Sequence, residues 1–207
     1  MSVSKMSNAQ FHNSVDNDPD NSSNYRSRNN TPRSLYNCGG YALSTYTWVL
    51  PCIRSFEDFT DYQDWTLDEL QHFDDFEHDY TDGRREALMV ELLNNGYSVD
   101  DACSVILKWD VKFLLLQFPF LREINPNGVS QKNRLIAYRV HIRYDSEYNE
   151  IYSDFHFKVR IGNCWSEKCG RSNIHKCKLM PNRVWRCGAD LEYRGKIAYL
   201  FDTRHKK

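Results

Sequence analysis

The chain has 207 residues, of which 41% are hydrophobic and 27% are charged, and its formal net charge is -1. This length is enough for one globular domain with a hydrophobic core but not for two full domains. No window reaches the ~18 uninterrupted apolar residues of a membrane span, and no basic-then-apolar secretion signal begins the chain. We therefore expect a soluble, cytoplasmic protein with no membrane partner, and the near-neutral charge argues against a coat for nucleic acid.

The seven cysteines are an odd number, so a complete set of disulfides would leave one thiol over. Because no secretion signal is present, we expect a reducing compartment. The thiols are then free for catalysis, metal binding or core packing.

The first 33 residues differ in composition from the rest. They contain seven Asn and seven Ser with only scattered apolar side chains, which is too little burial to offset the entropy of ordering. We predict a disordered polar tail over 1–33 and a single domain over 34–207.

The domain is predicted to begin with a helix. From Tyr36 to Leu50 the apolar side chains have helical spacing, and Pro51 ends the pattern. The start of this segment carries Cys38 and two glycines, Gly39 and Gly40.

An acidic, aromatic segment follows. Residues 55–83 contain eleven Asp or Glu and no Lys or Arg, and their many aromatic side chains argue against a disordered acidic tail. We expect loops and a short helix near Leu67 to Phe73. Because this segment lies in the chain between Cys38 and His156, two candidate site residues, it is also the candidate surface for a substrate or protein partner and is expected near the site that these two residues would form.

Helices and then strands complete the domain. Arg84 to Asn95 has a broad apolar face with Gly96 after it, and Ser98 with Asp101 caps a second helix to about Lys108. The type of Val111 to Leu121 is left open. From Arg134 the period changes to two, which predicts strands there, over Phe155 to Ile161 and over Lys196 to Asp202. This order indicates an α+β fold with an antiparallel sheet.

Cys38 stands at the start of the first predicted helix. Helix N-termini carry unpaired N–H groups and partial positive charge, which lower the pKa of a thiol from its usual ~8.5. The same groups can stabilise an oxyanion, and Gly39 and Gly40 leave room for a substrate backbone. Cys38 is therefore a candidate nucleophile, with an inert buried thiol as the alternative.

His156 lies on a predicted strand between two phenylalanines. Residues two apart on a strand share a face, so Asp154, His156 and Lys158 point one way and the phenylalanines the other. A side chain that titrates near neutrality on such a face suits a general base for a thiol. The alternative is a structural histidine bonded to Asp154.

Three short motifs occur in order: Asn37-Cys38-Gly39-Gly40-Tyr41-Ala42-Leu43, Asp154-Phe155-His156-Phe157 and Cys164-Trp165-Ser166-Glu167-Lys168-Cys169-Gly170. Together they resemble papain-like cysteine peptidases, most closely small bacterial and phage members related in layout to the NlpC/P60 group. The resemblance covers roughly residues 36–50 and 133–175. It implies N-terminal helices packed on an antiparallel sheet.

The resemblance also implies roles for these residues. Cys38 would attack an amide bond of a peptide or protein substrate with His156 as general base, and the backbone of Cys38 with the Asn37 side chain would stabilise the oxyanion. Glu167 and Asn163 are equal candidates for the residue that orients the imidazole. Ser166 is a further candidate and Asp154 a same-face alternative. The alternative function is an inactive scaffold that binds a protein as an effector or inhibitor.

A zinc-braced interaction protein is the competing interpretation. Five possible ligands lie within twenty-four residues, namely Cys164, Cys169, His175, Cys177 and Cys187. The four cysteines of this set are the candidate ligands of a structural zinc, the one cofactor that the sequence suggests, although paired C-x-x-C knuckles are missing. Zinc would brace the basic C-terminal part, 160–207, which has twelve Lys or Arg against four acids. We interpret this basic part as a solvated face rather than a nucleic-acid site, and zinc there is compatible with catalysis at Cys38.

Overall fold

The computed structural model describes residues 35–54, 62, 64–72, 75–127, 130, 133–145, 150–170, 172–177, 184–187 and 191–205. The predicted polar tail over 1–33 lies outside these residues. Among the helices within them, none combines the length and apolar character that a membrane span needs.

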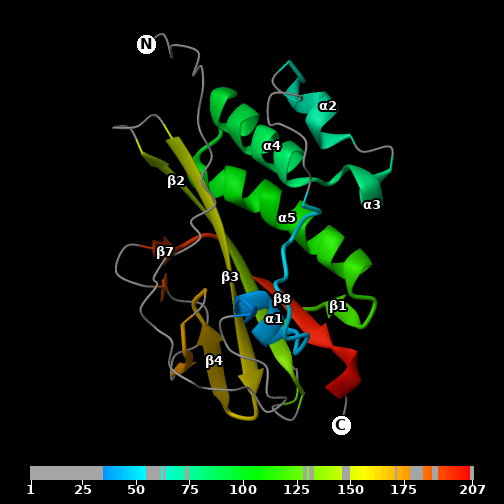
Figure 1. Ribbon diagram of the computed structural model, residues 1–207. Helices are drawn as coiled ribbons and strands as arrows, with labels where there is room; N and C mark the ends of the chain where they lie inside the picture. Colours follow the sequence, from blue (N-terminus) through cyan, green and yellow to red (C-terminus); the bar gives the residue numbers. More distant parts are fainter. Residues whose placement is uncertain are drawn as a thin grey trace.

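The centre of the fold is a six-stranded antiparallel sheet (Figure 1). Its spatial order is β1 (Leu121–Glu123), β8 (Ala198–Asp202), β2 (Leu135–Asp145), β3 (Glu150–Ile161), β4 (Cys164–Lys168) and β5 (Ile174–Cys177). A separate antiparallel pair, β6 (Trp185–Cys187) with β7 (Leu191–Tyr193), forms what we call the β6–β7 ribbon. The three predicted strand regions are confirmed, with β3 beginning five residues earlier than the expected segment.

Five α-helices are found in the described part of the chain: α1 (Cys38–Ala42), α2 (Leu67–Gln71), α3 (Phe76–Asp79), α4 (Asp82–Asn94) and α5 (Val99–Gln117). A 3-10 turn, η3 (Thr203–His205), follows the last strand. The predicted α+β class is confirmed, since helices precede an antiparallel sheet along the chain.

The alternation of β2 and β3 separates two hydrophobic cores. Ile136, Tyr138 and Val140 of β2 face the helices together with Phe157 and Val159 of β3. On the opposite face, Leu135 and Ala137 pack with Trp165 and with Trp185 and Tyr193 of the β6–β7 ribbon. The helices and the ribbon therefore cover opposite faces of the sheet (Figure 1).

The first helix is much shorter than predicted, because α1 ends at Ala42 instead of continuing to Leu50. The carbonyl of Gly40 accepts hydrogen bonds from the N–H groups of Thr45 and Tyr46, so the chain turns back over the helix. Ser44 and Tyr46 adopt left-handed backbone angles in this turn, with φ of 54° and 53°. The apolar residues whose spacing suggests a longer helix, such as Ala42 and Val49, are buried by this turn instead.

The segment of unsettled type is helical. α5 runs from Val99 to Gln117, past the predicted end near Lys108, and its N-cap is Ser98 as expected. Pro119 sets the end, because proline has no N–H to donate and disfavours helical angles in the residue before it.

The described part of the acidic segment lies away from the predicted site. α2 and α3 pack against α4 and α5 on the outside of the helical layer, far from α1 and β4 (Figure 1). The Arg84 guanidinium holds α2 in place by donating to the carbonyls of Glu69 and His72. The expectation that this segment borders the site is wrong for these residues.

A buried ion pair joins the helices to the sheet. Asp110 of α5 is fully buried and accepts two hydrogen bonds from the Arg85 guanidinium, at 2.8 Å and 2.9 Å. The hydroxyls of Tyr80 and Tyr138 donate to the same carboxylate. Arg85 also donates to the hydroxyl of Ser153 on β3, at 3.2 Å. α4, α5, β2 and β3 therefore share one polar network.

We predict that Asp110→Asn lowers the free energy of unfolding by about 3–5 kcal/mol, because it leaves the Arg85 charge buried without its counter-ion. Urea unfolding followed by circular dichroism measures this loss. Lys108→Gln changes an exposed residue of the same helix and is the control, with a change within about 0.5 kcal/mol. A loss of less than about 1 kcal/mol for Asp110→Asn would contradict the prediction.

Candidate active site

The candidate nucleophile begins α1, and Asn37 positions it. The Asn37 side-chain oxygen accepts from the N–H of Gly40 at 3.0 Å and from the N–H of Val49 at 3.1 Å, while its amide donates to the Val49 carbonyl at 2.6 Å. Asn37 thus caps the helix and fixes the returning chain. In this structure its side chain holds the turn through these bonds, and the oxyanion role that the resemblance implies stays a prediction.

The two glycines of the motif also serve the turn. A Cβ on Gly40 would lie 1.9 Å from the carbonyl oxygen of Thr47, and one on Gly39 would lie 3.0 Å from the Cβ of Val49. The space predicted for a substrate backbone is therefore filled by the chain itself.

The Cys38 thiol is buried against β3, with 4% of the residue exposed. Its hydrogen-bond acceptor is the carbonyl of Phe155, with an Sγ to oxygen distance of 3.9 Å. Burial, and then the charge of Asp154, raises the pKa of this thiol to about 12. The expected lowering by the helix N-terminus is not met, because desolvation outweighs a helix of only five residues.

The sulfur of Cys38 occupies the edge of β3 next to the end of β4. One edge of β3 pairs with β4, and this pairing ends at Lys158, opposite Glu167. The other edge of β3 pairs with β2 both there and at Phe155. A sulfur bonded to the Phe155 carbonyl therefore lies on the β4 side of the strand. The thiol packs with the core on the helix side of the sheet, whereas the imidazole of His156 faces Trp185 and Tyr193 of the ribbon, so the structure does not bring these two candidate groups into contact.

His156 is held by a carboxylate on the next strand. Its Nε2 lies 2.9 Å from Oε2 of Glu167, and the Nζ of Lys158 lies 2.8 Å from the same oxygen. His156 is 1% exposed and Glu167 is 9% exposed. A carboxylate at Nε2 favours the tautomer with its proton there, so Nδ1 is the nitrogen that can accept a proton.

The other candidates for orienting the imidazole lie elsewhere. Asn163 is exposed in the turn between β3 and β4. Ser166 faces the helix side, where its hydroxyl lies 2.7 Å from the hydroxyl of Tyr41. Asp154 accepts hydrogen bonds from the Tyr193 hydroxyl and from the N–H of Phe155, and burial raises its pKa. Of the four residues, Glu167 is the one bonded to His156.

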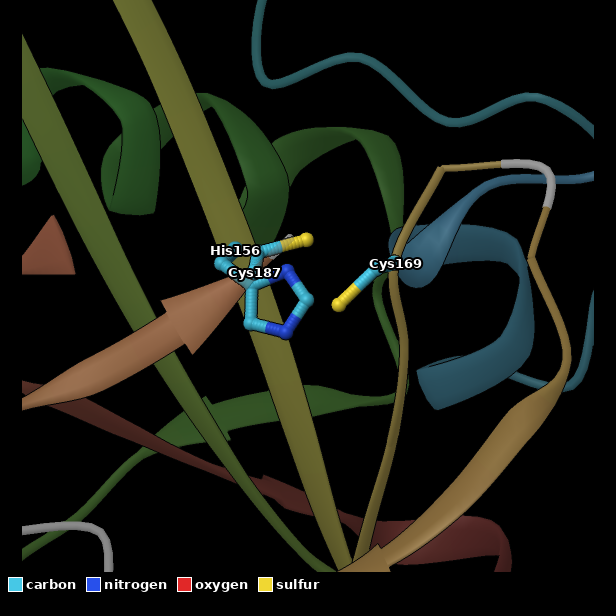
Figure 2. A group of neighbouring side chains, drawn as sticks. All are labelled: His156, Cys169 and Cys187. Atoms are coloured by element: carbon cyan, nitrogen blue, oxygen red, sulfur yellow. The ribbon is translucent and has the colours of Figure 1, made fainter. Parts of the chain in front are cut away.

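Two thiols converge on the imidazole of His156 (Figure 2). Cys169, just after β4, and Cys187, on β6, each place their sulfur within 4.8 Å of a ring nitrogen and of one another. The two thiols lie close enough to share a hydrogen bond, which lowers the pKa of one and raises that of the other. These three residues could hold a metal ion.

The structure does not assemble the zinc set that the sequence suggests. Cys164 is exposed at the start of β4, and Cys169 follows the end of that strand. At about 3.3 Å per residue, a strand of this length keeps the two sulfurs too far apart for one ion. His175 is exposed on β5, and the side chain of Cys177 lies outside the described residues.

Aromatic residues of the β6–β7 ribbon cover the imidazole. The ring of Tyr193 lies 5.3 Å from that of His156, and the ring of Trp185 lies 6.0 Å away. The ammonium of Lys158 and the guanidinium of Arg139 both lie over the Trp185 ring, at 5.1 Å and 4.8 Å. The site is closed on this side.

The sequence reasoning did not give Lys158 and Tyr193 any role in the site. Lys158 was recognisable, because it shares the strand face of His156 two residues away. The position of Tyr193 beside His156 depends on how the β6–β7 ribbon packs on the sheet, and the spacing of residues along the sequence does not reveal that packing.

We predict that Asn37→Ala lowers the free energy of unfolding by about 2–4 kcal/mol, because both the helix cap and the bonds to Val49 are lost. Ser98→Ala is the matched control, since the Ser98 side chain caps α5 through local bonds only and its loss costs about 1 kcal/mol. Chemical denaturation of the two variants measures both values. Equal losses would show that the bonds to Val49 contribute nothing.

Comparison with known proteins gave no match: no family model fits the sequence, and no curated protein or solved structure is significantly similar to it.

Proposed function

We propose that the protein is a thiol hydrolase that cleaves an amide bond, with Cys38 as nucleophile and His156 as general base. The observation that carries the proposal is the buried pair of His156 on β3 with Glu167 on β4. The Cys38 thiol packs against β3, the strand that carries His156. A helix-borne cysteine, a histidine strand and a carboxylate on the following strand agree with the papain-like arrangement that the motifs resemble.

The chemistry needs a proton transfer from the thiol. Because Cys38 packs in the helix-side core and His156 faces the ribbon, the proposed cycle begins with a movement of α1 and the ribbon that brings the Cys38 thiol to Nδ1 of His156, to which it gives its proton. The sulfur then attacks the substrate carbonyl carbon, and the C–N bond breaks as the imidazolium protonates the leaving amine. Water, deprotonated by His156, attacks the thioester, and the C–S bond breaks to release the acid and restore the thiol.

Glu167 has a positioning role in this proposal. Its carboxylate fixes the ring through Nε2, so that Nδ1 carries the lone pair, and it stabilises the imidazolium that forms after proton transfer. The Lys158 ammonium lies 2.8 Å from the same oxygen and offsets the charge of the carboxylate at its buried position. The pair therefore supplies a base whose orientation does not depend on the substrate.

Substrate entry requires movement of the covering residues. Trp185 and Tyr193 lie against the imidazole, and both are buried themselves. In the proposed function, displacement of the β6–β7 ribbon opens the face of the sheet that carries His156. The amide substrate is then a peptide or protein segment that takes the place of the ribbon.

Competitive alkylation tests the proposal. Metal-free native protein is treated with limiting iodoacetamide from mildly acidic to mildly alkaline pH, and each thiol is quantified by peptide mass spectrometry. We expect Cys38 to react at least ~10-fold faster than Cys103, and His156→Gln to slow Cys38 by ~100-fold or more. Glu167→Gln should slow it by ~10-fold or more, since the ring loses its orientation.

Cys52 and Cys103 are internal references, because both are buried thiols whose pKa is raised by burial, that of Cys103 to about 11. Their labelling follows the thiolate fraction and increases about tenfold per pH unit. In the closed structure Cys38 would behave in the same way, so a shallower pH dependence at Cys38 is the result expected if the proposed movement brings it to His156. Unchanged rates at Cys103 in the variants show that the fold is intact. If Cys38 reacts no faster than the references, the hydrolase is excluded and the inactive, protein-binding scaffold is the better explanation.

A further inference from the structure

We propose that His156, Cys169 and Cys187 form a binding site for a thiophilic divalent cation of the zinc class. The donors come from three separate parts of the chain: β3, the residue that follows β4, and the β6–β7 ribbon (Figure 2). The site differs from the four-cysteine set suggested by the sequence, and it includes the imidazole of the proposed hydrolase.

The spacing of the donors is close to that of a tetrahedral site. One nitrogen and two sulfurs lie within 4.8 Å of one another. Zn–S bonds of about 2.3 Å and Zn–N bonds of about 2.0 Å place tetrahedral donors roughly 3.5–3.8 Å apart. Small rotations of the two cysteine side chains are enough to reach this spacing.

The surroundings of His156 match those of a metal-bound histidine. Such a ligand commonly donates its second ring N–H to a carboxylate, which fixes the tautomer and strengthens the metal bond. Glu167 accepts from Nε2 at 2.9 Å, so Nδ1 is the nitrogen directed to the ion. Lys158, on the same carboxylate, balances its charge.

The donor types select the cation. Two thiolates and one imidazole are soft or borderline ligands, which favour zinc and disfavour magnesium or calcium. Binding releases the protons of both thiols, because the thiolate is the form that binds the ion. The resulting cluster of one divalent cation and two thiolates is neutral, so its burial carries no net charge.

An ion at this position would link the β6–β7 ribbon to the sheet. Cys187 lies on β6, beside the Trp185 and Tyr193 rings that cover His156. The ion also takes the Nδ1 lone pair that the base of the hydrolase needs. If the proposed function holds, cation binding and hydrolysis therefore exclude each other, because both need Nδ1 of His156.

Titration of the reduced, chelator-treated full chain with Co²⁺ tests the site. Cobalt is the probe because thiolate ligands give it a near-ultraviolet charge-transfer band and tetrahedral geometry gives intense visible bands. We expect one equivalent to bind with both signals, and Zn²⁺ to displace it. Cys169→Ser and Cys187→Ser should each halve the charge-transfer band and weaken binding by more than the ~10–100-fold that a supporting residue costs.

Cys164→Ser and Cys177→Ser are the matched controls, because both belong to the sequence-suggested zinc set but not to the proposed site. Their cobalt spectra and affinities should equal those of the unchanged protein. Glu167→Gln should keep the spectrum while binding weakens by ~10–100-fold, as expected for a positioning residue. Absence of Co²⁺ uptake, or its loss in Cys164→Ser, would overturn the proposal.

Cys38→Ser separates the two proposals. Its sulfur is not one of the three donors, so this variant should bind Co²⁺ as the unchanged protein does. Cobalt binding without fast alkylation of Cys38 in the metal-free protein supports the cation site and excludes the hydrolase. Fast alkylation of Cys38 without cobalt binding supports the hydrolase and excludes the cation site. Loss of the charge-transfer band in Cys38→Ser overturns the assignment of the ligands.

Discussion

The pairing of β2 with β3 is the interaction on which the rest of the structure depends. Eleven residue pairs bring the two strands together, and their alternation gives the sheet one face for the helices and one for the ribbon. Phe157 therefore enters the main core, while His156, its neighbour in the chain, faces Glu167. A register shift of one residue would exchange these two side chains and remove the site.

The Cys38 thiol and the His156 imidazole are both buried, but the thiol bonds to a backbone carbonyl and the imidazole to a carboxylate. Burial keeps the Cys38 thiol protonated, with a pKa raised to about 12, while the imidazole keeps a buried carboxylate partner. Two further thiols meet the same ring from other parts of the chain. The proposed proton transfer and the proposed cation binding therefore both involve Nδ1 of His156, which the ribbon covers.

The sequence predicted the parts of the fold that depend on local periodicity and capping. α4, the start of α5 and the strands have clear patterns, and the pairing of residues on one strand face placed Asp154, His156 and Lys158 together. It did not predict the end of α1, because that end depends on Asn37 binding the backbone of Val49. The choice of Glu167 and the meeting of Cys169 with Cys187 depend on long-range packing, which spacing along the chain does not reveal.

The roles of Asn37 and Gly40 affect how related sequences are interpreted. Both residues hold the turn over α1, and the carbonyl of Thr47 leaves no space for a side chain at position 40. Selection for folding alone would therefore keep them, even in a descendant that had replaced Cys38. An Asn-x-x-Gly signature identifies the scaffold and carries no information about turnover, whereas joint retention of a cysteine, a histidine and an acid at positions 38, 156 and 167 would mark the lineages under selection for chemistry.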